Sequence, residues 1–421
     1  MAGLISPLRA ILFIVFLQAV GTGLILPILP ALVERLAGPS GPSRATIYGL
    51  VMASSLVIMF LFSQLLGRVS DRYGRRPLLL MTLAGMTLAY LIMSMADSLA
   101  VLFAAQAIAG FCAASGAVGR AYIAEVTTPD KRAQSYAIIT AAVGLGFILG
   151  PVIGGNLGRF GTHMPFYVAC GLTALLFLFA LFALPESLDP DDVRPFSWRA
   201  AMPFASVPTL IKAPPLARGI VLASLIEAFA INLPSEIGAL MLFMQHSLQW
   251  NTAEIGMWLT LFGIGVAFGQ AVVTPLAIRL FGDRSAWLIG SLATALVFFA
   301  AGFMYRGWHM YALIAAYALI SFVGPVALSL VSQVVPRNQL GEIQGAFISL
   351  SSLIKAGAIA LGTVIFGYFT GPVTPMQIAG AAFFFGAACQ VPAVIYAFVT
   401  IRRNPVAGIS SETGNAGVAV G

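Results

Sequence analysis

Long apolar runs, separated by short polar segments, dominate the sequence. Of its 421 residues, 59% are hydrophobic and only 9% are charged. A soluble protein of this length could not bury so much apolar surface. A helix needs about 20 apolar residues to cross the hydrocarbon core of a bilayer. The runs therefore predict an all-α membrane protein whose first partner is the lipid bilayer.

Twelve of the runs are long enough to span a membrane. The first begins near Leu8 and is followed by many others, so we interpret it as a retained helix and not as a signal peptide. The expected spans are 9–32, 46–69, 77–96, 99–125, 134–157, 164–184, 217–244, 253–280, 285–304, 308–334, 341–369 and 375–401.

Lysine and arginine are distributed unevenly between the two sides of these spans. With the N-terminus inside, sixteen of them fall in inside segments and four in outside loops. Because basic residues are enriched on the cytoplasmic side, we expect both termini to be cytoplasmic. The chain is then a multi-pass membrane protein.

The longest polar segment divides the chain into two halves of six spans. We expect an N-terminal bundle at 1–184, a cytoplasmic central loop at 185–216, a C-terminal bundle at 217–401 and a disordered tail at 402–421. The halves echo each other, since Gly74-Arg75-Arg76 after the second span matches Gly282-Asp283-Arg284 after the eighth. Transporters built from such repeats hold their substrate between the repeats, near the bilayer midplane.

The composition argues against several other classes of protein. The net charge of +7 is scattered over short loops, which does not suggest nucleic-acid binding. Cys112, Cys170 and Cys389 lack metal-ligand spacing, so we expect no metal. There is no ATP-binding G-x-x-x-x-G-K-[ST] sequence, and no cofactor is expected. An enzyme or a receptor is less favoured, because neither a clustered catalytic constellation nor an extended soluble domain is evident.

One polar segment between two apolar runs is especially informative: Gly67-Arg68-Val69-Ser70-Asp71-Arg72-Tyr73-Gly74-Arg75-Arg76. Gly67 would let a helix end approach a neighbour closely, and Gly74 would permit a turn with positive φ. Asp71 is an acid that could lie on the N-terminus of another helix. Arg75 and Arg76 would hold the loop on the cytoplasmic side.

This segment resembles the signature loop between helices 2 and 3 of the major facilitator superfamily. The resemblance implies the major facilitator fold, with twelve helices in two pseudo-symmetric bundles, and transport by alternating access. It also implies a gate in which Asp71 caps the eleventh span near Leu340 and Gly341, while Arg75 approaches Glu125 or Asp130. The expected gate residues are Gly67, Asp71, Arg72, Gly74, Arg75, Arg76 and Glu125.

The fifth span contains a glycine-rich segment, Gly146 to Gly155. It resembles the G-x-x-x-G-P-x-x-G-G motif of antiporter branches of the superfamily, which indicates export; tight helix packing is the alternative. With Leu184-Pro185-Glu186-Ser187 after the sixth span, the chain is similar to the drug:proton antiporters, and among them to the tetracycline exporters. The motif residues are Gly146, Gly150, Pro151, Gly154 and Gly155.

The chain also departs from the tetracycline exporters. Gln18 stands where those exporters usually carry an aspartate, and Gln106 where an arginine is usual. Arg120 stands where a small residue is usual. Tetracycline as the substrate therefore stays open, and the alternative is an anionic metabolite or siderophore.

Charged residues inside the spans are costly and mark functional positions. Arg120 is expected to contact an anion or form part of the inner gate; the alternative is that it snorkels or pairs with Glu125. Glu227 and Lys355 lie near mid-membrane, where an ion pair that opens and closes could couple transport to protons; the alternative is a purely structural ion pair. Glu236 is the second candidate for proton coupling.

Polar side chains within the spans provide candidate contacts for a small-molecule substrate, although any of them could instead join helices. We expect the chain to be a monomer that moves a small organic solute against protons. The candidate substrate-binding residues are Gln18, Gln106, Arg120, Asn232, Gln270 and Lys355.

Overall fold

The structure is a computed structural model that describes residues 6–404, apart from 39–43, 129–130, 194, 206, 236, 336, 372–373 and 375–376. Within these residues every regular element is helical, as predicted. The predicted tail lies almost wholly outside the described residues.

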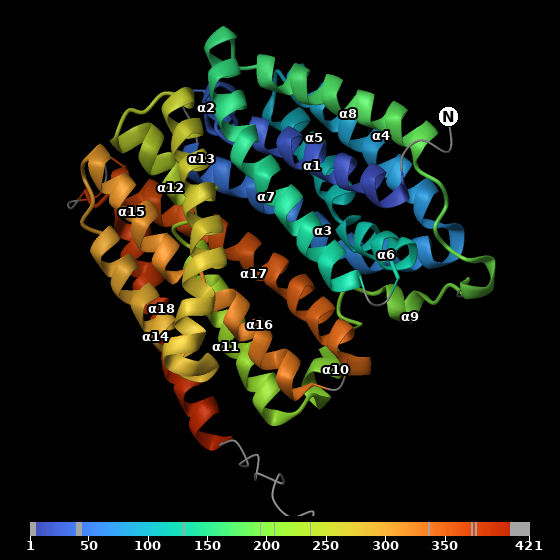
Figure 1. The fold of residues 1–421 in the computed structure, drawn as a ribbon. Coiled ribbons are helices and arrows are strands. Elements are labelled where there is room, and N and C mark those ends of the chain that lie inside the picture. The colour runs from blue at the N-terminus through green and yellow to red at the C-terminus, as the bar shows by residue number, and fades with distance from the viewer. Residues whose placement is uncertain are drawn as a thin grey trace, which may run out of the picture.

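The first half contains eight α-helices (Figure 1). The first expected span is divided in two, since Pro27 and Pro30 cannot continue an unbroken helix. The elements are α1 (Pro7–Ile25), α2 (Leu29–Ala37), α3 (Arg44–Tyr73), α4 (Arg75–Ser94), α5 (Leu99–Ala113), α6 (Gly116–Val126), α7 (Arg132–Leu157), the short η1 (Gly158–Phe160) and α8 (Met164–Ala183).

A connecting segment and the second half follow. The connection contains three short helices, η2 (Pro190–Asp192), α9 (Trp198–Ala201) and α10 (Val207–Lys212). The second half contains α11 (Pro215–Asn232), α12 (Ala239–Leu242), η3 (Phe243–Ser247), α13 (Thr252–Phe268), η4 (Gly269–Val273), α14 (Thr274–Ala301), α15 (Gly307–Ile320), α16 (Val323–Val334), α17 (Arg337–Thr370) and α18 (Ala381–Arg403).

Eleven stretches of the described chain are long and apolar enough to cross a membrane, against twelve expected. The difference arises at 252–301, where the eighth expected span runs into most of the ninth. Gly282 has non-helical backbone angles inside this stretch (φ 71°, ψ 159°), so two helices meet there at a kink. The number of apolar stretches therefore depends on one tight turn.

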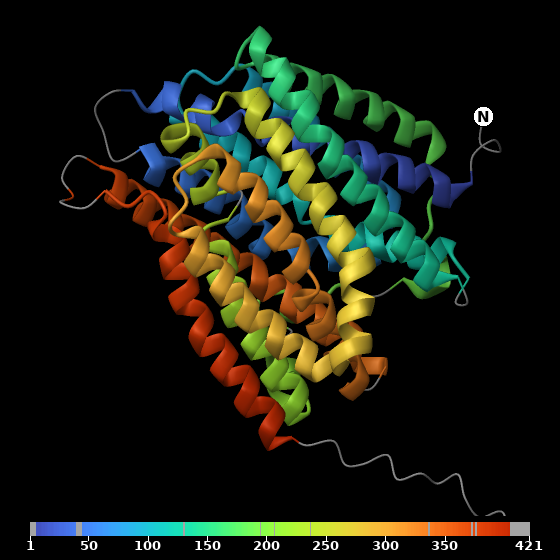
Figure 2. The ribbon, with the colours of Figure 1, turned by 60° about the vertical axis from the view of Figure 1, so that its left-hand side comes forward.

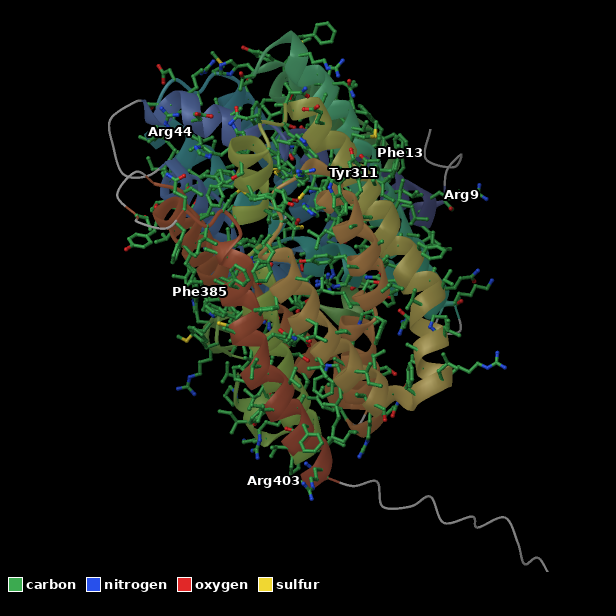
Figure 3. All side chains as sticks on the ribbon, turned by 90° about the vertical axis from the view of Figure 1, so that its left-hand side faces the viewer. Arg9, Phe13, Arg44, Tyr311, Phe385 and Arg403 are labelled. Carbon is green, nitrogen blue, oxygen red and sulfur yellow. The ribbon has the colours of Figure 1, made fainter. Side chains whose placement is uncertain are left out.

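The helices form two groups that meet along a limited seam. Within the first half α1 packs on α7 and α4 on α8, and within the second half α18 packs on both α11 and α14. Across the seam α3 packs on α17, and α7 lies alongside α13 (Figure 2). Exposed Phe13 and Phe385 lie on the flanks of the bundle, where lipid would cover them (Figure 3).

The two ends of the bundle differ in how closely the halves approach. We call the end with Gly74 and the connecting segment the loop face, and the other end, with Arg44, the opposite face. Near the opposite face, Tyr48 Oη donates to the Ile237 carbonyl (2.9 Å) and Thr260 Oγ1 to the Ile148 carbonyl (2.6 Å). Both hydrogen bonds join the two halves on this side of the seam.

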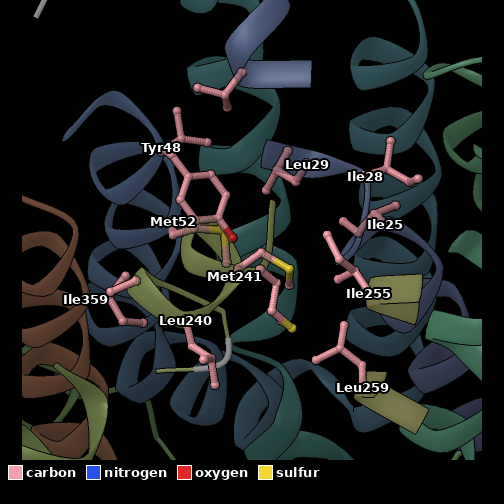
Figure 4. Close-up of a cluster of buried hydrophobic side chains, with 14 of the residues drawn as sticks. Ile25, Ile28, Leu29, Tyr48, Met52, Leu240, Met241, Ile255, Leu259 and Ile359 are labelled. Carbon is pink, nitrogen blue, oxygen red and sulfur yellow. The ribbon is translucent and has the colours of Figure 1, made fainter. Parts of the chain in front are cut away.

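Apolar side chains fill the seam near the opposite face. Leu29 and Met52 of the first half lie near Met241, Ile255 and Ile359 of the second, within one buried cluster (Figure 4). Between helices in a bilayer, such contacts stabilise the seam through van der Waals packing. The seam therefore holds the halves together at the opposite face.

Candidate functional site

The signature loop is a tight turn around Arg75. Gly74 has φ 102°, which confirms the predicted turn. Arg75 is 7% exposed; its Nη1 donates to Asp71 Oδ1 (2.6 Å) and its Nη2 to Glu125 Oε1 (2.9 Å). The predicted contact between Arg75 and Glu125 is thus present. One guanidinium joins the ends of α3, α4 and α6.

Glu186, which the sequence did not assign to the gate, caps this turn. Its carboxylate accepts hydrogen bonds from the backbone N–H groups of Arg75 (2.9 Å) and Arg76 (3.2 Å). An anion is favoured there because the first N–H groups of α4 have no partner within the helix. A Cβ at Gly74 would overlap the Glu186 carboxylate, so a larger residue would have to push this cap aside. The acid of Leu184-Pro185-Glu186-Ser187 was visible in the sequence, but its partner across the fold was not.

Other members of the expected gate are less engaged. No described atom lies within 4 Å of the point where a Cβ at Gly67 would stand, so its predicted close approach to a neighbouring helix stays a prediction. Arg72 is exposed and lies over the ring of Tyr73 (5.6 Å). The predicted Asp71 cap involves Leu340 and Gly341, whose side chains lie outside the described residues, as does Asp130.

The glycine motif of α7 packs against helices of both halves. A Cβ at Gly146 would lie 2.6 Å from that of Ala19 in α1, and a Cβ at Gly150 would lie 2.6 Å from Gly23 Cα. Gly154 also abuts α1, at the Leu24 carbonyl. On the second-half side, Gly155 abuts the Thr252 backbone and Pro151 abuts Gly256, both in α13. The geometry fits the tight-packing interpretation, and it places the motif where the halves meet.

A cavity of about 350 Å³ lies within the first half, between α1, α4, α6 and α7. Two predicted residues, Gln18 and Arg120, line it. The alternative pairing of Arg120 with Glu125 is wrong for this structure, because Glu125 bonds to Arg75 and to Ser187 (2.6 Å). No ion pair of Arg120 is present among the described residues.

A second cavity, of about 520 Å³, lies within the second half, between α11, α16 and α17. Glu227 and Asn232 line it. Glu227 is 5% exposed, and its Oε1 accepts hydrogen bonds from Ser291 Oγ and from Gln390 Nε2, each at 2.9 Å. The expected pairing of Glu227 with Lys355 is not among the described ion pairs, since the carboxylate turns towards α14 and α18 instead.

The remaining predicted site residues lie outside the two cavities. Gln106 is 5% exposed within α5, and Gln270 is exposed on η4. Lys355 is half-buried on α17 and lines neither cavity. Glu236 lies outside the described residues. The structure thus gathers Gln18 with Arg120 and Glu227 with Asn232, and separates Gln106, Gln270 and Lys355 from them.

Two residues beside Glu227 were missed. Gln390 is completely buried in α18, and Ser291 is 2% exposed in α14. The signal for Gln390 was an amide in the middle of the last apolar run, but it was not among the polar residues selected. Ser291 offered no such signal, because serine is common in apolar helices.

Comparison with known proteins identifies the family. The model of the Major Facilitator Superfamily matches residues 11–237. The chain is 34% identical over 397 residues to the class C tetracycline resistance protein of Escherichia coli, covering 93% of this chain and 94% of that protein. It is 34% identical over 353 residues to the class G tetracycline resistance protein of Vibrio anguillarum, covering 81% and 86%.

Solved structures show the same fold at lower sequence identity. The human organic anion transporter MFSD10 (TETRAN) has a TM-score of 0.69 at 20% identity, covering 93% of this chain and 99% of that chain. A bacterial homologue of the human lysosomal transporter Spinster, inward-facing and occupied, has a TM-score of 0.74 at 16% identity, covering 94% and 96%. With its signature turn and its two helical halves, the chain belongs to the major facilitator superfamily.

Proposed function

We propose that the chain is a secondary active transporter that exports a small organic solute in exchange for protons. The observation that carries this proposal is Glu227, a buried carboxyl in the wall of a cavity with no cation paired to it among the described residues. Ionisable groups in that position commonly serve proton relays. Support also comes from relatives named for tetracycline resistance and from the glycine motif of α7.

In this proposal the loop face is cytoplasmic, in a bacterial inner membrane, and both termini lie on that side. The excess of basic residues in the loop-face segments supports the orientation. Because the halves are joined near the opposite face, the structure is then an inward-open state. Alternating access would proceed by rocking of the bundles at 1–184 and 217–401 about the seam.

The turn around Arg75 is the proposed inner gate. Arg75 holds Asp71 and Glu125 in place, and Glu186 fixes the start of α4. When the loop face closes, Asp71 would cap the N-terminus of α17, where unpaired N–H groups favour an anion. The turn thus keeps the capping acid positioned while the gate is open.

The surroundings of Glu227 suit a carboxyl that changes its protonation state. The Gln390 amide now donates its NH₂ to the carboxylate, while its Oε1 is buried and has no partner among the described residues. A half-turn of the amide would bring Oε1 to Glu227, where it could accept a hydrogen bond from the protonated acid. The same two residues would then satisfy both the charged and the neutral carboxyl.

A second candidate substrate class rests on Arg120. Its guanidinium lines the first-half cavity without an ion pair among the described residues, which favours an anionic or zwitterionic solute. Gln18 in the same cavity and Asn232 in the other would add hydrogen bonds. Tetracycline and carboxylate metabolites are thus both suitable probes. Gln106, Gln270, Lys355 and Glu236 would contribute only in another state of the cycle.

Transport into inverted membrane vesicles tests the proton coupling. Glu227→Gln is expected to abolish accumulation of tetracycline driven by a pH gradient, because the amide cannot exchange the proton, yet to leave downhill exchange measurable. The matched control is Glu254→Gln, which changes an exposed carboxyl of the same half at the start of α13. A full response of Glu227→Gln to the gradient would refute coupling through this residue.

A further inference from the structure

A third cavity, of about 550 Å³, lies at the opposite face, on the seam between the halves. We call it the seam pocket. Its first-half wall comes from α2 and the start of α3, and its second-half wall from α12, η3, the segment after η3 and the end of α17. It is remote from Arg75, and Arg120 and Glu227 do not line it. It exists as one pocket only while the halves are together at this face.

The seam pocket contains one charge of each sign. Glu34 Oε1 accepts from Arg44 Nη1 (2.5 Å), and its Oε2 accepts from Gln245 Nε2 (2.9 Å), which crosses the seam. The side chains of Glu34 and Arg44 are 48% and 49% exposed, so solvent and solutes reach them. An exposed ion pair of this kind is worth only about 0–1 kcal/mol. Breaking the Glu34–Arg44 ion pair to bind a ligand that pairs with both charges therefore requires little free energy.

Aromatic residues line the same pocket. Trp250 is half-buried, Tyr48 and Phe366 are buried in the wall, and the His246 ring lies edge-on to Phe366 at 6.3 Å. Aromatic faces bind planar rings and stabilise a nearby cation. The pocket thus offers separate places for a ring, an anion and a cation.

The backbone beside the pocket is irregular. Gln249, which lines it, has φ 55° and is the one non-glycine residue with positive φ in the described chain. It follows η3, a single π-helical turn that supplies Gln245 and His246. Strained backbone and π-helical turns cluster at ligand sites. Here they bring two amides and an imidazole to one wall of the pocket.

We propose that the seam pocket binds a small aromatic zwitterion from the opposite face. The carboxylate of the ligand binds Arg44, and its ammonium group binds Glu34. Its ring lies against Trp250 and Phe366. Because the two walls belong to different halves, a bound ligand favours the state in which this face is closed. The ligand therefore acts as a brake on transport. The binding itself does not rest on proton coupling by Glu227.

Calorimetry on the purified protein tests the binding with three indoles that differ only in charge: L-tryptophan, tryptamine and indole-3-propionate. L-tryptophan is expected to bind at least about tenfold more tightly than the others, which each lose one ionic contact. Arg44→Gln should weaken the binding of L-tryptophan and of indole-3-propionate, which carry a carboxylate. Glu34→Gln should weaken the binding of L-tryptophan and of tryptamine, which carry an ammonium group. Trp250→Leu should weaken the binding of all three indoles. Equal affinities for the three indoles, or no binding, would overturn the proposal.

Arg35→Gln is the matched control. Arg35 lies on the same helix as Glu34 but contacts His163, outside the pocket; partial burial and Arg35 together lower the pKa of that histidine. This variant should bind L-tryptophan as the unchanged protein does, and equal weakening by Arg35→Gln and Arg44→Gln would refute the site. Glu227→Gln should also bind normally, which separates failure of this proposal from failure of proton coupling.

Accessibility of the seam tests the effect on conformation. Thr363 is fully buried against Gly49 across the seam, so a cysteine there reacts with a maleimide only when the opposite face opens. In a chain whose own cysteines are replaced by serine, saturating L-tryptophan should slow labelling of Thr363→Cys several-fold. Unchanged or faster labelling would refute the brake.

Discussion

The two halves contain the same turn at corresponding positions, but only one of the turns is strongly charged. Gly74 and Gly282 both have positive φ. After each glycine an arginine reaches the end of its own half, since Arg76 donates to the Leu181 carbonyl and Arg284 to the Asn404 carbonyl, each at 2.8 Å. The repeat therefore preserves backbone geometry and a helix-end contact.

The charges distinguish the two turns. Glu125 and Gln333 are separated by the same length of chain as Gly74 and Gly282. In the first half Glu125 holds Arg75 in an ion pair, whereas in the second half Gln333 bonds to Asp283 through an amide (2.5 Å). The turn is thus a structural element of both halves. Among the described residues the ionic network occurs at the first-half turn alone, and this network is what suits a gate.

The cavities repeat the contrast. Each lies between corresponding helices, α1, α6 and α7 in the first half and α11, α16 and α17 in the second. The cation Arg120 lines the first cavity, and the buried acid Glu227 lines the second. A pseudo-symmetric scaffold therefore presents opposite charges on its two sides, which supports a division between substrate binding and proton exchange.

The largest expected effect is at the first-half turn. Arg75→Gln removes the cation between Asp71 and Glu125 and leaves two acids facing each other, and loss of one partner of a buried ion pair costs roughly 3–5 kcal/mol. Initial rates of tetracycline uptake by inverted vesicles, per amount of folded protein, should fall by at least about tenfold. Arg72→Gln is the control, because Arg72 lies in the same loop but outside the network. Similar rates for the two variants would contradict the gate.

A smaller and selective effect is expected in the first-half cavity. Arg120→Gln removes the positive charge and keeps a hydrogen-bonding side chain, so the KM for carboxylate-bearing solutes should rise several-fold, while that for purely cationic solutes stays unchanged. The measurement is the concentration dependence of uptake for both kinds of solute in the same vesicles. Equal changes for both would remove the argument for an anionic or zwitterionic substrate.

Local chemistry explains which features the sequence could predict. The apolar runs predicted most of the spans, and Gly74 predicted the turn, because both depend on residues that are close in the sequence. The contact of Glu125 with Arg75 could also be predicted, because each charge needs a partner. The partners of Glu227 and the docking of Glu186 depend on how distant helices pack, which no local pattern encodes. Lys355 was predicted as a partner of Glu227 only because both lie near the middle of a span. That position does not determine which side of the helix Lys355 occupies. The eighth and ninth spans read as separate runs, and the non-helical turn at Gly282 does divide that stretch into two helices.

The smallest expected effect is at the second-half turn. Asp283→Asn removes a charge, but asparagine can still accept the hydrogen bond from Gln333, and the turn itself depends on Gly282. An exposed interaction of this kind is worth less than about 1 kcal/mol, so uptake should stay within about twofold of the unchanged protein. Glu125→Gln is the corresponding change in the first half. It leaves the buried Arg75 with one acid in place of two, so uptake by this variant should be clearly slower than uptake by Asp283→Asn. If the two variants were equally impaired, the charge asymmetry would not be what separates a gate from a simple turn, and the gate would have to be sought in both halves.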